Sequence, residues 1–283
     1  MKINHLLGLL LVLSLGTVSC NLDLDKNKNI DYQLLATDAS VSDNISSDTY
    51  RLVDQESRNG EFSDSVGKVA TNLQWVSSVD TCAIVTLNVN GGNFPMTLTI
   101  DFGSGCTDGY GVVRKGKVIG VFSGYYSSNG TRVDVSFNNY YVNGYKVEGQ
   151  KSIVNNGRNA QQKLQFSVVD ANGRITKPDG GIISWESTRT HVWDEGESTP
   201  LFFCDDVYSI TGTASGEISD GTPYAIRTES AVKKNVCCPY VDEGVVTYAV
   251  DGSDIATIDY GGGSCDGLAN ITANGNTFVV IIQ

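Results

Sequence analysis

The sequence predicts an all-β fold braced by disulfides, and three observations indicate it. Short runs of alternating apolar and polar residues follow one another from Leu73 to the C-terminus. Many of these runs are separated by Asn-Gly or Asp-Gly, which suit two-residue hairpins because both turn positions need positive φ. Six of the seven cysteines lie in this region. We therefore expect an antiparallel β-sandwich or two similar β-meander half-units.

Residues 1–19 have the features of a secretory signal peptide. Lys2 supplies a short basic start, and Leu6 to Val18 form an apolar stretch too short to span a bilayer comfortably. Cys20 follows at once, in a setting that resembles a relaxed bacterial lipobox in which Thr17 replaces the usual Leu. We expect Cys20 to be acylated and to anchor the protein in membrane lipid. Cleavage by an ordinary signal peptidase after Ser19 is the alternative.

Residues 20–72 are polar and rich in Asp, Ser and Asn, with little periodicity. This composition predicts a lipid-anchored tether, with one short helix around Ser47–Glu56. Asp23 and Asp25 resemble acidic signals for surface export. The expected location is the bacterial cell envelope, at the outer membrane or the cell surface.

Residues 73–283 form the expected all-β domain, and its half-units would cover about 73–155 and 156–283. Alternation is clear in Val133, Val135 and Phe137, which would share one face of a strand. About 210 residues are enough to bury a sizeable core. The predicted turns are Asn129-Gly130, Asn143-Gly144, Asn172-Gly173, Asp179-Gly180, Asp220-Gly221, Asp251-Gly252 and Asn274-Gly275.

An internal repeat suggests how the cysteines pair. The block Thr-Ile-Asp-aromatic-Gly, followed by glycine, cysteine and an Asp-Gly dipeptide, occurs from residue 99 and again from residue 257. Another cysteine precedes each block. A disulfide closing each loop of about 25 residues would add about 3.5 kcal/mol on the chain-entropy model. The expected pairs are Cys82–Cys106 and Cys238–Cys265.

Cys204 and Cys237 remain, and we expect them to pair with each other. An even number of cysteines in an exported chain favours disulfides over free thiols. Zinc is disfavoured because the chain has no Cys-x-x-Cys pair, and the adjacent Cys237 and Cys238 cannot easily supply two tetrahedral ligands. The sequence predicts no metal site and no cofactor.

Several blocks resemble a group of Bacteroidota lipoproteins to which no activity is assigned, with a lipidated cysteine and a β-rich body. The resemblance covers the chain from about residue 80 onward and implies a cell-envelope lipoprotein. It implies no catalytic role. The blocks that carry it are Asp101 to Cys106, Asn139 to Gly149, Trp185 to Thr190 and Asp259 to Gly261.

Charge and histidine content exclude several functions. The formal net charge is −12, and it becomes −13 when Lys2 leaves with the signal peptide, so a nucleic-acid partner is not expected. After loss of His5, His191 is the one remaining histidine, and no Gly-x-Ser-x-Gly motif is present. We therefore expect no enzyme that depends on a Ser-His or Cys-His pair.

The candidate ligand patch lies in one strand-like run. Trp185, Arg189, His191 and Trp193 have the same parity and would line one face of a strand, where aromatic rings stack on sugars. The default interpretation of these residue types is nevertheless packing in the core or against the next strand, with Arg189 over a ring. A second aromatic group surrounds the Asn143-Gly144 turn, where strand pairing is the alternative to ligand binding. It comprises Tyr125, Tyr126, Tyr140, Tyr141 and Tyr145.

Together these features predict a non-enzymatic envelope lipoprotein that serves surface binding, adhesion or scaffolding. A glycan or another envelope protein is the expected partner. A carbohydrate-active enzyme, or its accessory subunit, is the alternative function. Glycoside cleavage would need two carboxylates at a fixed separation. The candidates are Glu148, Glu186, Asp205 and Asp206.

Overall fold

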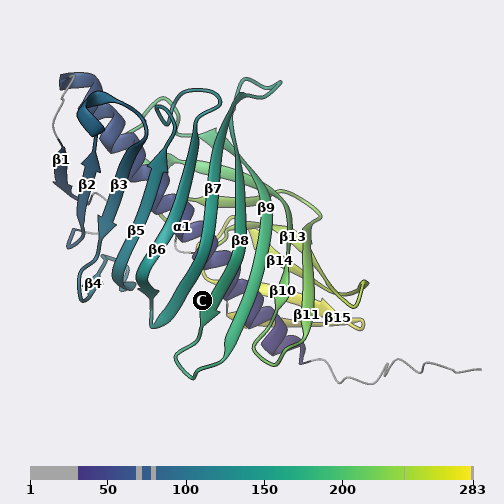
Figure 1. The fold of residues 1–283 in the computed structure, drawn as a ribbon. Helices are drawn as coiled ribbons and strands as arrows, with labels where there is room; N and C mark the ends of the chain where they lie inside the picture. Colours follow the sequence, from purple (N-terminus) through teal and green to yellow (C-terminus); the bar gives the residue numbers. More distant parts are fainter. Residues whose placement is uncertain (1–30, 68–71, 78–80, 239, 282–283) are drawn as a thin grey trace, which may run out of the picture. The chain divides into compact units, whose positions relative to one another are not determined.

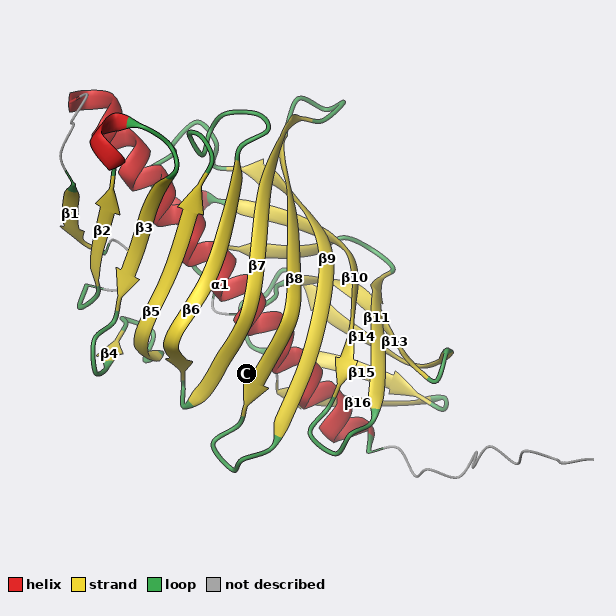
Figure 2. Ribbon diagram, in the orientation of Figure 1, coloured by secondary structure: helices red, strands yellow, loops and turns green. Residues whose placement is uncertain are grey.

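One long helix, 16 strands and two short 3-10 helices, η1 (Asn90–Gly92) and η2 (Phe203–Asp205), are the regular elements of the part of the chain that the structure describes (Figure 2). This computed structural model describes residues 31–67, 72–77, 81–238 and 240–281. The elements are α1 (Tyr32–Gly67), β1 (Leu73–Val76), β2 (Ile84–Asn88), β3 (Met96–Asp101), β4 (Cys106–Thr107), β5 (Val113–Phe122), β6 (Arg132–Val142), β7 (Tyr145–Arg158), β8 (Leu164–Thr176), β9 (Ile182–Glu195), β10 (Val207–Glu217), β11 (Pro223–Thr228), β12 (Val232–Asn235), β13 (Glu243–Val250), β14 (Ser253–Gly262), β15 (Leu268–Ala273) and β16 (Asn276–Ile281).

The strands form a single antiparallel sheet in which neighbours in sequence are nearly always neighbours in space. The order is β1-β2-β3-β5-β6-β7-β8-β9-β10-β11-β13-β14-β15-β16, with β4 beside β5 and with β12 beside β10 and β13. The all-β antiparallel class is therefore confirmed. The sheet runs without a break through residues 155 and 156, so the division into two half-units is wrong.

Most of the expected turns occur where the sequence placed them. Asn143-Gly144, Asp251-Gly252 and Asn274-Gly275 each join two strands through two residues of positive φ. Asn172-Gly173 is different, because it lies inside β8, where the pairing with β9 shifts register. A Cβ at Gly173 would lie 2.6 Å from the carbonyl oxygen of Trp185, so this glycine permits a close approach of two strands.

Helix α1 corrects the prediction of a tether. It contains 36 residues, against the short helix expected around Ser47–Glu56. The carboxylate of Asp31 caps its first turn, accepting a hydrogen bond of 2.9 Å from the backbone N–H of Leu34. The tether prediction is thus wrong for residues 32–67. Cys20 and the signal peptide lie outside the described residues.

The sheet curls around α1, which runs obliquely along its inner face (Figure 1). Strands far apart in the sheet touch the same helix: Arg189 of β9 binds Asp43, and Tyr248 of β13 lies beside Ser40. Helix residues as different as Leu52 and Asp38 are fully buried. The helix thus occupies the place that the second sheet of a sandwich would take.

Charged and polar groups of α1 are matched by groups on the inner face of the sheet. Asp38 binds Lys177 at 2.7 Å and accepts a hydrogen bond of 2.9 Å from the backbone N–H of Ser219. Ser46 donates a hydrogen bond of 2.6 Å to Asp170, which also binds Lys151. Because buried charges are costly unless they are paired, these contacts specify where the polar helix sits.

The sequence repeat is also a structural repeat. In the first copy Val85 pairs with Ile100 across β2 and β3; in the second, Val246 pairs with Ile258 across β13 and β14. Within each block the aspartate accepts a hydrogen bond of 2.9 Å from the backbone N–H two residues on, that of the block's glycine. The acceptors are Asp101 and Asp259.

All three expected disulfides are present. They join Cys82 to Cys106, Cys204 to Cys237 and Cys238 to Cys265. The first ties β4 to the segment before β2. The other two meet at the adjacent residues Cys237 and Cys238, so they hold the segment between β12 and β13 from both sides.

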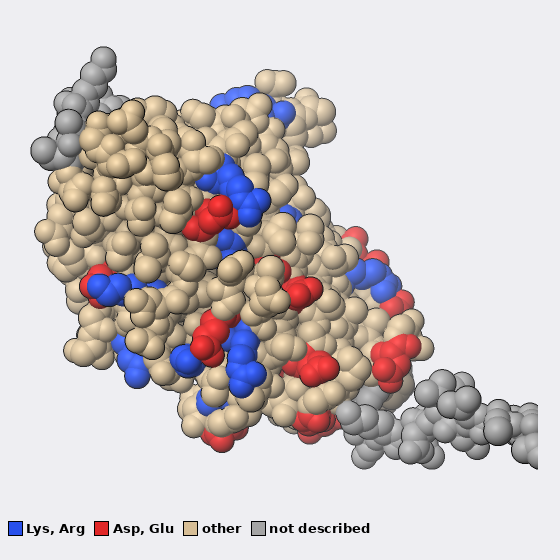
Figure 3. Space-filling model, in the orientation of Figure 1, with Lys and Arg blue, Asp and Glu red and all other residues tan. Residues whose placement is uncertain are grey.

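The outer face over β5–β9 carries basic and acidic side chains side by side, without one large patch of either sign (Figure 3). Exposed pairs such as Arg132 with Asp134 and Lys146 with Glu148 account for this mixture. Such pairs contribute little to stability because water screens them. Within the described residues, no helix combines the length and the apolar character needed to cross a bilayer.

Candidate functional site

The candidate ligand patch is buried, as the core-packing interpretation of these residues expects, and it is not a surface site. Trp185, Arg189, His191 and Trp193 do share one face of β9, as their parity predicts. That face points inward, and each of the four residues is at most 8% exposed. Helix α1 covers this part of the inner face, so no ligand reaches the two tryptophans in this structure.

Trp193 belongs to a closed network. Its ring stacks on Tyr208 with centroids 5.8 Å apart, and its Nε1–H donates a hydrogen bond of 3.0 Å to Asp206. Arg58 of α1 lies over the same ring and binds both Asp206, at 2.6 Å, and Asp54, at 2.7 Å. Burial, opposed by Arg58, raises the pKa of Asp206 to about 6.

His191 packs against Tyr50 of α1, with ring centroids 4.3 Å apart. Burial, reinforced by Lys151 and Arg189, lowers the pKa of His191 to about 3. Its Nδ1 has no hydrogen-bond partner among the described residues. The side chain is therefore neutral at physiological pH.

The remaining sequence candidates do not gather in one place. Tyr126 and Tyr140 are buried, Tyr125 is exposed in the β5–β6 loop, and Tyr145 opens β7. Of the four carboxylates, Glu186 is exposed on β9. The other three have separate partners: Glu148 binds Lys146, Asp205 accepts a hydrogen bond from Thr199, and Asp206 binds Arg58.

One group of possible metal ligands occurs in the described residues. Cys238, Asp242 and Cys265 bring a ligand atom each within 4.8 Å of one another. Both sulfur atoms belong to the same disulfide, and a disulfide offers no thiolate to a metal ion. This group is a covalent brace beside a buried carboxylate.

A different cavity, of about 520 Å³, lies beside the N-terminal half of α1. Its walls come from α1, the β4–β5 loop, the β6–β7 turn, Pro178, β12 and the segment after β12. Ligand sites for small molecules commonly have volumes of about 300–1,000 Å³. We call this cavity the tyrosine pocket, because it is lined by Tyr110, Tyr145 and Tyr240.

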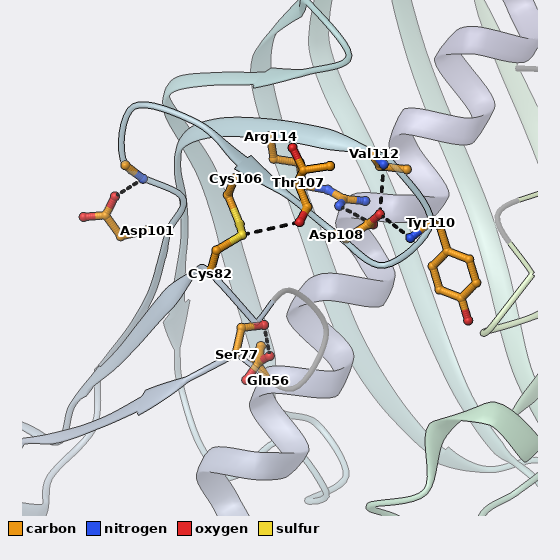
Figure 4. Close-up of a disulfide and its surroundings, with 11 residues drawn as sticks. Glu56, Ser77, Cys82, Asp101, Cys106, Thr107, Asp108, Tyr110, Val112 and Arg114 are labelled. Atoms are coloured by element: carbon orange, nitrogen blue, oxygen red, sulfur yellow. Dashed lines mark hydrogen bonds and ion pairs between the residues drawn. A yellow bond between two sulfur atoms is a disulfide. The ribbon is translucent and has the colours of Figure 1, made fainter.

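The β4–β5 loop places Tyr110 at the pocket. Asp108 accepts hydrogen bonds of 2.9 Å from the backbone N–H groups of Tyr110 and Val112, which fixes the turn (Figure 4). The Tyr110 ring points away from the Cys82–Cys106 disulfide and is 63% exposed. A large ring held open to water on a fixed turn suits a binding surface.

The floor of the pocket is charged. Arg114 of β5 binds Asp48 of α1 at 2.8 Å and Asp108 at 2.8 Å, and it is fully buried. Arg51, one turn further along α1, shares Asp48 at 2.7 Å. Burial alone would raise the pKa of Asp48, but Arg114 and Arg51 outweigh it and lower this pKa to about 2.

Lys234 of β12 completes the lining. Its ammonium group donates hydrogen bonds to the carbonyl oxygens of Cys238 and Tyr240. Burial lowers the pKa of Lys234 to about 7, opposed by Asp242 and assisted by Arg51. Lys234 therefore holds the segment after β12 and also presents a weakly compensated charge to the cavity.

Sequence analysis identified part of this pocket for other reasons. Asp108 was noted as a repeat residue, Tyr145 as one of the clustered tyrosines and Cys237 and Cys238 as disulfide partners. Arg51, Arg114 and Lys234 were missed, because no local pattern indicates that three cations so far apart in sequence converge. The available signal was Arg114, a charged residue at a buried position of the strand β5.

Fold and site together define a disulfide-braced antiparallel sheet wrapped around a polar helix, with a preformed pocket at the helix. No protein-family model, no curated protein and no solved structure matches the chain.

Proposed function

We propose that this protein is a non-enzymatic binding protein of the bacterial cell envelope, anchored through acylated Cys20, whose ligand occupies the tyrosine pocket. The observation that carries the proposal is the pocket itself: a cavity of about 520 Å³ that combines three tyrosines with charged groups. Pockets of this size with a few convergent polar groups are the usual form of a small-ligand site.

The walls of the pocket support binding to a preformed site. Cys237 and Cys238 both line it, and each is held by a disulfide to another part of the chain. Lys234 ties the same segment through two backbone carbonyl groups. Preorganisation of this kind reduces the entropy lost when a ligand binds.

Tyrosine side chains favour a glycan as the ligand. A tyrosine presents an apolar ring face, on which a sugar ring can stack, and a hydroxyl group that can exchange hydrogen bonds with sugar hydroxyls. The volume suits a terminal sugar or a short oligosaccharide better than the surface of a folded protein. The Bacteroidota-like lipoprotein blocks and the signal-peptide pattern support the envelope location.

Glycoside cleavage remains the alternative function, and no described contact favours it. The two carboxylates that line the pocket, Asp48 and Asp108, are both bound by Arg114. A carboxylate held by a guanidinium group is a poor proton donor. Mass spectrometry of glycans incubated with the protein would reveal cleavage.

A glycan array tests the proposal, with the mature chain carrying Cys20→Ser. Binding is expected for the wild-type pocket and is expected to fall at least tenfold in Tyr110→Ala and in Tyr240→Ala. Tyr125→Ala is the matched control, because Tyr125 is also exposed but lies beyond the opposite end of β5. Equal binding by all four proteins would contradict the assignment of the pocket. Palmitate labelling that depends on Cys20 tests the anchor.

A further inference from the structure

The charges of the tyrosine pocket are not evenly paired. Arg114 is bound by both lining carboxylates, Asp48 and Asp108, and is fully buried beneath them. Arg51 shares only one oxygen of Asp48, at 2.7 Å, and its side chain is 17% exposed. Lys234 has no carboxylate within ion-pair distance among the described residues. The lining therefore holds three cations and two carboxylates, and the surplus lies at Arg51 and Lys234.

Lys234 also has a donor left over. An ammonium group has three N–H bonds, and two of those of Lys234 go to the carbonyl oxygens of Cys238 and Tyr240. Partial charges on two carbonyl groups compensate a full positive charge less well than a carboxylate does. A ligand anion would supply the missing partner for the third N–H bond.

We propose that the ligand carries a carboxylate, bound in the tyrosine pocket between Lys234 and Arg51. This inference rests on the proposed function and names the chemistry that the pocket recognises. The planar guanidinium group can donate two parallel hydrogen bonds to a carboxylate, and the ammonium group adds a compact point charge. Stacking on the tyrosines would then select an acidic sugar over a small organic acid.

Proton binding gives the proposal a distinct signature. The pKa of Lys234 is about 7, so much of its ammonium charge is lost by pH 8. A bound carboxylate favours the charged form of Lys234, so Lys234 should take up a proton when the ligand binds at pH 8. Affinity is therefore expected to fall about tenfold between pH 6 and pH 8.

The other titratable groups that face Lys234 lie on α1, on β9 and after β12. Asp48 of α1 keeps its charge over this range, since its pKa is about 2. Burial raises the pKa of Asp242, after β12, which accepts a hydrogen bond of 2.7 Å from the backbone N–H of Asn235. Lys234→Met keeps Asp242, so the variant separates the titration of Asp242 from that of Lys234. His191 of β9, across a small adjoining cavity, stays neutral because its pKa is about 3.

Calorimetry with matched probes tests the inference on the mature chain carrying Cys20→Ser. Methyl glucuronide and methyl glucoside differ in one carboxylate, and succinate represents a free organic acid. The glucuronide is expected to bind at least tenfold more tightly than the glucoside at pH 6. In Lys234→Met this preference and the pH dependence are expected to disappear.

Lys233→Met is the matched control, because Lys233 belongs to the same strand but points outward and pairs with Glu243. It should leave both affinities unchanged. Arg51→Gln gives an independent test from α1 and should also reduce the preference for the glucuronide. Circular dichroism confirms that each variant is folded. If Lys234→Met unfolds the chain, Arg51→Gln and the wild-type pH dependence still decide the question.

The outcomes separate the inference from the proposed function. If both sugars bind equally, and equally well in Lys234→Met, the proposed recognition of a carboxylate is wrong. The assignment of the pocket as the ligand site is then unaffected. Lys234-dependent binding of succinate alone supports the acid site and overturns the glycan assignment. Binding of none of the three probes overturns the inference. Glycans bound on the array through Tyr110 and Tyr240 would still uphold the pocket.

Discussion

Two charge clusters lie about two turns apart on α1, and they differ in access to water. The first, Asp48 and Arg51 with Arg114 and Lys234, lines the tyrosine pocket. The second consists of Asp54, Arg58, Asp206, Trp193 and Tyr208. Both contain arginine and aspartate, and both have aromatic residues beside them. We call them the open cluster and the sealed cluster.

The comparison shows that residue type does not separate a site from a structural network. In the sealed cluster each charge meets its partner inside the protein, as when Arg58 binds Asp54 and Asp206. In the open cluster Arg114 is satisfied, whereas Arg51 and Lys234 border a cavity. Completeness of pairing and access to a cavity make the difference, and both can be tested by substitution.

The largest difference is expected for the two helix arginines. Arg58→Gln leaves Asp54 and Asp206 without their buried cation and should lower the free energy of unfolding by about 3–5 kcal/mol. Arg51→Gln should cost at most about 1 kcal/mol, because Arg114 still binds Asp48. Urea unfolding monitored by circular dichroism measures both. Similar losses in the two variants would remove the distinction between sealed and open clusters.

The fold was largely predictable because its signals are local. Alternation and Asn-Gly or Asp-Gly turns specify an antiparallel meander, and the repeated block specified the pairing of Cys82 with Cys106. The full length of helix α1, beyond the short helix expected around Ser47–Glu56, was missed because it has no apolar stripe: polar residues such as Asp38 and Glu56 are buried as fully as Leu52. Their partners lie far along the chain, as Ser219 does from Asp38, so no local pattern reveals them.

The site was less predictable for a related reason. Alternation in β9 correctly placed Trp185 and Trp193 on one face, but it cannot say which face is inside. Arg189 and His191 on that face kept a ligand patch open as an alternative to core packing, whereas Asp43 and Tyr50 of α1 cover them. A polar core element thus makes polar strand residues misleading as surface markers.

A smaller effect is expected from the pH dependence of stability near the sealed cluster. The pKa of His191 is about 3 in the folded chain, against 6.5 when unfolded. Below pH 6.5 the unfolded chain binds a proton that the folded chain does not, so stability is complete above that pH and falls as the pH drops toward 3. The loss from this group should be about 3 kcal/mol between pH 6.5 and pH 4.

Urea unfolding of wild type and His191→Phe over this range isolates the histidine, because the other titrating groups are common to both. Phenylalanine keeps a ring against Tyr50 and does not titrate. As the pH drops from 6.5 to 4, the free energy of unfolding of the wild type should fall by about 3 kcal/mol relative to that of His191→Phe. Parallel curves would mean that His191 is charged in the folded protein, and the closed interior inferred for β9 would be wrong.

The smallest effect distinguishes the two buried tryptophans of β9. Trp193→Phe loses the hydrogen bond from Nε1–H to Asp206, in addition to some packing. Trp185→Phe is the matched control, because the Nε1–H of Trp185 has no partner among the described residues and its loss removes packing alone. Trp193→Phe should therefore be the less stable variant by about 1.5 kcal/mol, the usual worth of a hydrogen bond to a charged group. Neither substitution should change ligand affinity, since α1 separates both rings from solvent. If either folded variant lost ligand binding, the inner face of β9 would have to take part in the ligand site. That result would contradict the conclusion that this face is closed to solvent.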